Sequence, residues 1–69
     1  MTTALEHDIL AELRERDLEV HQLRRQLKAC GRPASHEAVY ERLVHLEATD
    51  QARVLVLGDK QPVRVWGAL

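Results

Sequence analysis

The sequence lacks the disulfides that stabilise many very small proteins. Its 69 residues include one cysteine, one tryptophan, one tyrosine and no phenylalanine. A single cysteine cannot form an internal disulfide, and no second cysteine is present to complete a common zinc-binding spacing. With so few aromatic residues, the core must be built mainly from leucine and valine.

A long apolar segment is also missing. No run approaches the ~20 residues that span a bilayer. The opening residues, MTTALEHDIL, lack the basic region and apolar stretch of a secretory signal. We therefore expect a soluble, cytoplasmic protein with no membrane partner. A chain of this length fits one small domain, which we expect to comprise residues 1–69.

Catalytic and metal-binding motifs are absent as well. The serines, acids and four histidines are spread along the chain with no phosphate loop, nucleophile elbow or metal-ligand spacing. We therefore expect no enzyme, no cofactor and no metal site. Cys30 is interpreted as a small structural residue near a helix end, with a reactive or metal-binding role as the alternative.

Charge is distributed unevenly along the chain, although the net charge is only −1. Residues 1–19 carry six acidic and two basic side chains, whereas residues 20–36 carry four basic side chains and no acidic one. The basic segment could meet nucleic-acid phosphate. A solvated helix face is the alternative interpretation of the same run.

The first half of the chain predicts two helices. An apolar stripe at four-residue steps indicates a helix over residues 4–16, with Thr2 or Thr3 as its cap. This stripe consists of Leu5, Ile9 and Leu13. A second stripe predicts a helix over residues 20–30 that ends at Gly31. It consists of Val20, Leu23 and Leu27.

The stretch SHEAVYERLVHLE predicts a third helix over residues 36–48. Gly31 and Pro33 interrupt the chain before it, and Ser35 is suited to cap it. Apolar residues recur at three- and four-residue steps, which places them on one side of the helix. They are Val39, Leu43 and Leu46.

A β-hairpin is predicted directly after this helix. Residues 53–57 form a short aliphatic run, and residues 63–66 form a return strand beyond the turn at 58–62. One side of the return strand is aliphatic, and the other carries Arg64 and Trp66. Trp66 is expected to cover the first helix, with a stacking platform as the alternative. The predicted fold is therefore α+β, in the order helix, helix, helix, hairpin.

This order is that of a three-helix winged helix-turn-helix with a C-terminal two-stranded wing. SHEAVYERLVHLE resembles the recognition-helix pattern S-x-x-T-V-Y-R-x-L-x-x-L-E of bacterial winged-helix regulators, notably the DNA-binding half of ferric-uptake-regulator-like proteins. The matching residues are Ser35, Val39, Tyr40, Leu43, Leu46 and Glu47. VRVWGAL is similar to the closing strand of a wing, so the resemblance covers residues 18–66. Ala38 and Glu41 depart from the pattern, where the family has threonine and arginine.

The resemblance implies a small sequence-specific DNA-binding transcriptional regulator of bacterial or phage type. The third helix would enter the major groove, while the second helix and the wing contact the backbone. The residues nearest base edges would be Ser35, His36, Glu37 and Tyr40. The phosphate contacts would be Arg24, Arg25, Lys28, Arg32, Arg42, Lys60 and Arg64. Only the DNA-binding half of the family is matched, so its metal chemistry does not carry over.

Double-stranded DNA is the expected partner. A homodimer is expected to bind it, because one module of ~70 residues makes few base contacts. Two of these residues have structural roles as alternatives to DNA contact. Tyr40 could form an edge of the core, and His36 could be a solvated residue in the first turn of its helix. The alternative function is a protein-binding winged-helix adaptor or inhibitor that does not bind DNA, as the near-neutral charge permits.

Overall fold

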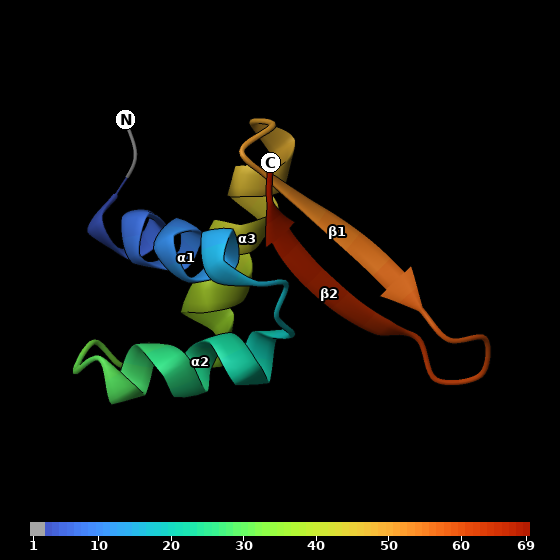
Figure 1. Cartoon of the computed structure of the whole chain (residues 1–69), viewed down its shortest axis with the longest axis horizontal. Coiled ribbons are helices and arrows are strands. Elements are labelled where there is room, and N and C mark those ends of the chain that lie inside the picture. The colour runs from blue at the N-terminus through green and yellow to red at the C-terminus, as the bar shows by residue number, and fades with distance from the viewer. Residues whose placement is uncertain (1–2) are drawn as a thin grey trace.

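The computed structural model describes residues 3–69, which form three helices followed by a two-stranded antiparallel sheet (Figure 1). The elements are α1 (Ala4–Glu15), α2 (Val20–Ala29), α3 (His36–Ala48), β1 (Ala52–Leu57) and β2 (Val63–Ala68). The helices gather at one end, and the hairpin projects from them. This arrangement confirms the predicted winged helix-turn-helix. Within residues 3–69 no helix is both long and apolar enough to cross a membrane.

Side-chain caps fix the starts of α1 and α3. The Oγ1 atom of Thr3 accepts the backbone N–H of Glu6 at 3.2 Å, and the Oγ atom of Ser35 accepts that of Ala38 at 3.1 Å. Each bond satisfies a backbone donor that has no partner inside the helix. The predicted caps at Thr3 and Ser35 are therefore confirmed, whereas the alternative cap at Thr2 lies outside the described residues.

The helix ends differ slightly from the prediction. α3 has the predicted bounds, but α1 and α2 each end one residue early. Arg16 leaves the helix because its backbone is extended, with φ −169° and ψ 159°. Cys30 caps the end of α2, and Gly31 follows with a φ of 77°, a conformation that costs glycine little. The predicted stop at Gly31 is confirmed.

The segment between α1 and α2 joins the sheet, which the sequence did not indicate. Leu18 forms an isolated antiparallel bridge with Trp66. The N–H of Leu18 donates to the carbonyl of Trp66 at 2.9 Å, and the N–H of Trp66 donates to the carbonyl of Leu18 at 2.8 Å. These two bonds occupy the outer edge of β2 and tie the wing to the helices.

Both strands are longer than predicted. β1 starts one residue earlier, and β2 continues two residues past Trp66, through Gly67. A glycine usually weakens a strand, but here Gly67 leaves room for the side chain of Asp17. A Cβ atom at Gly67 would collide with the carboxylate of Asp17, so a larger residue here would require the Asp17 side chain to move.

The core lies where the three helices meet the base of the hairpin. Every helix and strand contributes to it, and leucine dominates. The buried apolar residues are Ile9, Leu10, Leu13, Leu18, Leu23, Leu27, Val39, Leu43, Leu46, Ala52 and Trp66. The leading role expected of leucine is confirmed. The comparable role expected of valine is not confirmed. Val39 is the one valine among these buried residues, and four of the other valines lie in the strands of the hairpin.

The two faces of the hairpin have different environments. Trp66 is 3% exposed and meets the ring of Tyr40 in an edge-to-face contact, with ring centroids 6.2 Å apart. Trp66 is thus a core residue, which confirms its predicted role in packing and excludes an exposed stacking platform. Since residues alternate between faces, Val63 and Val65 lie on the outer side of β2.

Candidate nucleic-acid interface

One surface collects side chains from α2, the first turns of α3, and the wing. We call it the α2–α3–wing surface and define it by two adjoining grooves. Its defining residues are His21, Arg24, Arg25, Lys28, His36, Tyr40 and Arg64. His21 lines both grooves, so they form one continuous strip along α2 toward the wing.

The groove nearest the wing has a volume of about 340 Å³ and joins α3 to β2. Arg64 Nη1 donates a hydrogen bond to the hydroxyl oxygen of Tyr40 at 3.0 Å. The ring of Tyr40 lies parallel to that of His36, at a centroid distance of 6.2 Å. The indole Nε1 of Trp66 is buried, with no hydrogen-bond partner among the described residues. These contacts hold the start of α3 against the wing.

Cations of α2 line the second groove. Arg24 Nε donates to the carbonyl of Ala34 at 3.1 Å, which fixes α2 to the turn before α3. Arg25 and Lys28 are exposed, and within residues 3–69 neither side chain makes a hydrogen bond or ion pair. Both cations are therefore free to meet an anionic ligand.

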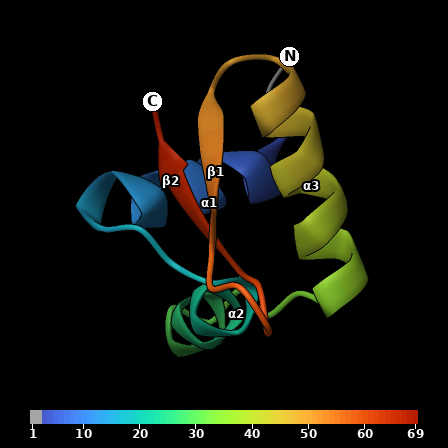
Figure 2. The ribbon, with the colours of Figure 1, turned by 90° about the vertical axis from the view of Figure 1, so that its right-hand side faces the viewer.

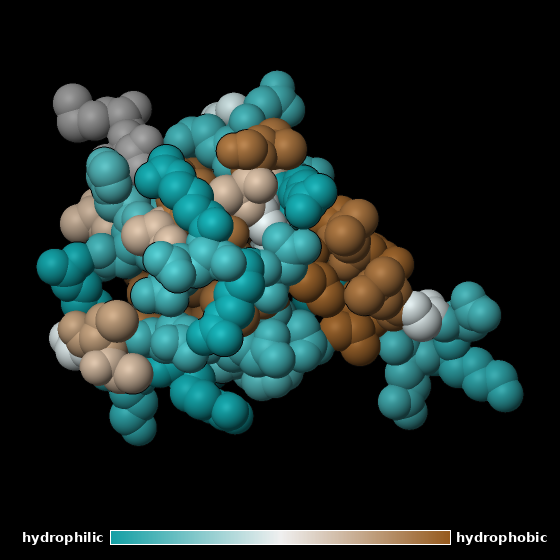
Figure 3. Space-filling view, viewed as in Figure 1, coloured by the Kyte–Doolittle hydropathy of each residue, from teal (hydrophilic) through white to brown (hydrophobic). Residues whose placement is uncertain are grey.

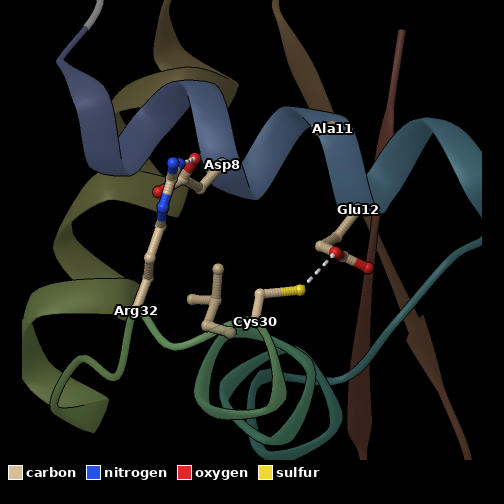
Figure 4. A pocket seen from close by; sticks show the side chains of 6 residues that line it. Asp8, Ala11, Glu12, Cys30 and Arg32 are labelled. Atoms are coloured by element: carbon tan, nitrogen blue, oxygen red, sulfur yellow. Dashed lines mark hydrogen bonds and ion pairs between the residues drawn. The ribbon is translucent and has the colours of Figure 1, made fainter.

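Two of the predicted phosphate-contact residues instead pair with acids of α1. Arg32 forms an ion pair with Asp8, as Figure 4 shows. Arg42 Nη1 lies 3.3 Å from Oε1 of Glu6, whose side chain is only 2% exposed. Neither arginine lines the α2–α3–wing surface. Their contact with DNA stays a prediction, one for which each ion pair would have to be broken or shared.

Cys30 lies in a shallow pocket between α1 and the end of α2 (Figure 4). Its Sγ atom is 3.7 Å from Oε1 of Glu12. Its predicted place near a helix end is confirmed. Among the side chains described, no three of His, Cys, Asp and Glu are grouped to hold a metal ion.

The other predicted contact residues are exposed but lie outside the two grooves. Ser35 uses its hydroxyl oxygen to cap α3, and Glu37 lies in the first turn of that helix. Lys60 lies in the loop between the strands. His21 was missed at the sequence level. Its position one turn before Arg24 and Arg25 was the available signal, since residues three or four apart share a helix face.

Comparison with known proteins supports the fold. The chain matches no protein-family model and no curated protein. It resembles the structure of a PadR-like transcription factor from Bacteroides fragilis, with a TM-score of 0.87 and 16% identity. The match covers 94% of this chain and 65% of that one.

A second similar structure is Bacillus subtilis PadR in complex with operator DNA. The TM-score is 0.84 at 21% identity, and the match covers 96% of this chain and 40% of that one. The chain thus spans less than two thirds of the length of either protein. These structures do not confirm the resemblance to ferric-uptake regulators. They show that the chain has the winged helix-turn-helix fold found in PadR-type transcription factors.

Proposed function

We propose that the chain is a sequence-specific DNA-binding transcriptional regulator whose α2–α3–wing surface faces the duplex. The observation that carries this proposal is the pair of adjoining grooves lined by cations of α2 and the wing and by the rings of His21, His36 and Tyr40. The similarity of the fold to B. subtilis PadR, whose structure holds operator DNA, supports it.

In this proposal α3 enters the major groove by its N-terminal turns, as in other helix-turn-helix proteins. His36 and Glu37 then lie closest to base edges. A carboxylate such as Glu37 can accept a hydrogen bond from the amino group of cytosine, and a histidine can donate to purine acceptors. Tyr40 is held by Arg64, so it would reach the duplex in one orientation.

The sequence-independent part of the affinity comes from the flanking cations. Arg25 and Lys28 lie on α2 and line the groove beside Pro33 and Ala34, in the turn before α3, and Lys60 and Arg64 belong to the wing. Each phosphate contact should contribute about 0.9 to the slope of log affinity against log salt. Exposed Glu41 opposes these contacts, because its carboxylate repels phosphate.

A fluorescence-anisotropy titration of random duplex DNA at two salt concentrations tests the proposal. Replacing Arg25 and Lys28 by alanine should weaken binding to every duplex and lower the salt slope by roughly two. The matched control replaces Arg14 and Arg53, which removes the same charge outside the surface and should leave the slope unchanged. Absence of salt-dependent binding by the unaltered protein would overturn the proposal.

Glu41 supplies a variant of opposite sign. Glu41→Arg should tighten nonspecific binding, since it exchanges a repelling charge for an attracting one on the exposed side of α3. The same substitution at Glu47, at the far end of α3, is the matched control and should change the affinity less. Equal affinities for Glu41→Arg and the unaltered protein would argue against α3 as the reading helix.

One observation favours the alternative, a protein-binding winged helix. Leu55, Leu57 and Val63 are 46%, 55% and 39% exposed on the hairpin, which is unusual for aliphatic side chains on one small surface. In this alternative the wing binds a protein, and Glu41→Arg leaves the affinity for DNA unchanged.

A further inference from the structure

The hydroxyl group of Tyr40 is held in place by its neighbours. Arg64 Nη1 donates a hydrogen bond to the hydroxyl oxygen at 3.0 Å. The rings of Tyr40 and Trp66 meet edge to face, with an angle of 89° between their planes, and Trp66 is buried. Rotation of the Tyr40 side chain would break the hydrogen bond and the aromatic contact together. The hydroxyl therefore stays at the junction of α3 and the wing.

The proton of this hydroxyl has no acceptor. A tyrosine hydroxyl offers one proton to donate and also accepts hydrogen bonds. Because an arginine side chain is a donor only, the Tyr40 proton cannot be directed at Arg64. No hydrogen bond within residues 3–69 has the Tyr40 hydroxyl as its donor. The group is therefore free to donate to a ligand.

Arg64 has unused donors beside that proton. Its guanidinium carries five N–H groups, and one of them is engaged with Tyr40. Arg64 is exposed, and it pairs with no acid in the part of the chain that the structure describes. Figure 3 shows hydrophobic residues gathered over the wing, and β2 reads VRVWGA. Arg64 is thus the one charge that β2 offers to an anion.

The groove around these two side chains is rich in donors and poor in acceptors. Trp66 lines it, and the buried Nε1–H of this residue has no acceptor among the described residues. Of the residues that the structure describes, Glu19 is the one acid lining this groove. Its Oε2 atom lies 3.7 Å from Nε2 of His21. The groove therefore favours a negatively charged group that accepts hydrogen bonds.

A backbone phosphate of DNA has the required chemistry. Its two non-bridging oxygens share a negative charge and only accept hydrogen bonds. One oxygen can accept the Tyr40 proton while the other accepts a free N–H of Arg64, and such charge-assisted bonds are strong. In the proposed docking, the wing lies over the backbone that flanks α3. Figure 2 shows α3 running along one side of the hairpin, so a group held at the junction of α3 and β2 faces that backbone.

We propose that Tyr40 and Arg64 hold one backbone phosphate between them, so that Tyr40 positions α3 and does not read a base. This contact rests on the proposed function, and it differs from the sequence-based expectation that Tyr40 lies at a base edge. The wing and the reading helix then bind the same phosphate. Phosphate contacts fix the register of a protein on the duplex but carry no sequence information themselves. Base reading is left to His36 and Glu37.

Removal of the hydroxyl alone tests the role of Tyr40. Fluorescence anisotropy compares a random duplex with a duplex selected from a random-sequence library for tight binding. Tyr40→Phe keeps the ring and should weaken binding to both by the same factor, on the order of tenfold, since a hydrogen bond to a charged group is lost. A loss confined to the selected duplex would show that Tyr40 reads a base. That result, or an unchanged affinity for both duplexes, would overturn the proposal.

Arg64→Gln removes the charged partner. It should weaken binding to both duplexes equally and lower the salt slope by about 0.9, whereas Tyr40→Phe removes no charge and should leave the slope unchanged. The two substitutions together should cost less than the product of their separate effects, because both act on one phosphate. Arg53→Gln is the matched control on β1, since Arg53 pairs with Asp17 and lines neither groove. Independent effects of the two substitutions would contradict the shared contact.

A neutral phosphate analogue identifies the contact itself. Methylphosphonate replaces one phosphate of the selected duplex at a time and removes its negative charge. At one position, the loss of affinity seen with the unaltered protein should disappear in the double variant, while losses at other positions persist. Circular dichroism should show the variants folded. Arg64 is exposed, so Arg64→Gln alone carries the same comparison if Tyr40→Phe does not fold.

The outcomes separate this contact from the function on which it rests. If the unaltered protein binds DNA but no methylphosphonate position depends on Tyr40 and Arg64, the phosphate contact is wrong and the proposed function stands. If the unaltered protein binds neither duplex, both are wrong.

Discussion

Removing the guanidinium of Arg42 should destabilise the fold, because it would leave the carboxylate of Glu6 buried without a cation. Glu6 is 2% exposed, and its Oε1 atom accepts hydrogen bonds from Thr3 at 3.2 Å and from Arg42 at 3.3 Å. Its Oε2 atom has no hydrogen-bond partner among the described residues. Arg42 is therefore the main source of compensation for a charge held away from water.

The magnitude follows from the burial of the two partners. Breaking a fully buried ion pair from one side costs about 3–5 kcal/mol. The Arg42 side chain is 36% exposed, so solvent already screens the pair, and a loss of about 2–3 kcal/mol is the reasonable expectation. A chain of 69 residues has a free energy of unfolding of roughly 3–10 kcal/mol, so Arg42→Ala should lower it markedly.

Urea denaturation followed by circular dichroism measures this loss. Arg53→Ala is the matched control, because its partner Asp17 lies at a similar distance, 3.4 Å, but is 40% exposed. That variant should change stability by less than about 1 kcal/mol. Adding Glu6→Gln to Arg42→Ala should restore part of the loss by removing the stranded charge. If Arg42→Ala were as mild as Arg53→Ala, or the double variant were no better than the single one, the reasoning would be wrong.

Three further substitutions test the fold. Leu43→Ala removes a fully buried side chain of α3 and should cost on the order of 2–5 kcal/mol in urea denaturation; a negligible loss would mean that the core is misassigned. Ser35→Ala removes the cap of α3 and should cost about 1 kcal/mol, visible as a lower melting temperature, whereas Ser35→Asp should retain most of the stability. Gly31→Ala should cost about 1–2 kcal/mol through the backbone alone, since φ is 77° and no atom lies within 4 Å of the added Cβ; an unchanged melting temperature would contradict this.

The helices and their caps were predictable because their signals are local. A stripe such as Val39, Leu43 and Leu46 repeats within one element, and a serine before it caps the same element. The bridge between Leu18 and Trp66 was not predictable, since it joins residues 48 positions apart in sequence. The close approach of Gly67 to the Asp17 side chain was not predictable either, since these residues are 50 positions apart.

The candidate site likewise has features that were visible in the sequence and features that depend on how the elements pack. The basic run after residue 19 was visible in the sequence, and Arg25 and Lys28 are exposed and unpaired among the described residues. The sequence could not show that Arg32 and Arg42 reach back to acids of α1, because those pairs depend on how the helices pack. Nor could it show the hydrogen bond from Arg64 to Tyr40, which requires the wing to fold against α3.

Amide chemical-shift mapping on the 7.9 kDa chain tests the central claim most directly. Addition of duplex DNA at low salt should shift the backbone signals of the α2–α3–wing surface and of residues 35–37, and should leave the outer face of β1 unchanged. Glu15 and Glu47, far from the expected contact, serve as internal references. Shifts confined to α1 or to the outer face of the wing, or no shifts at all, would contradict the proposal that this surface binds DNA.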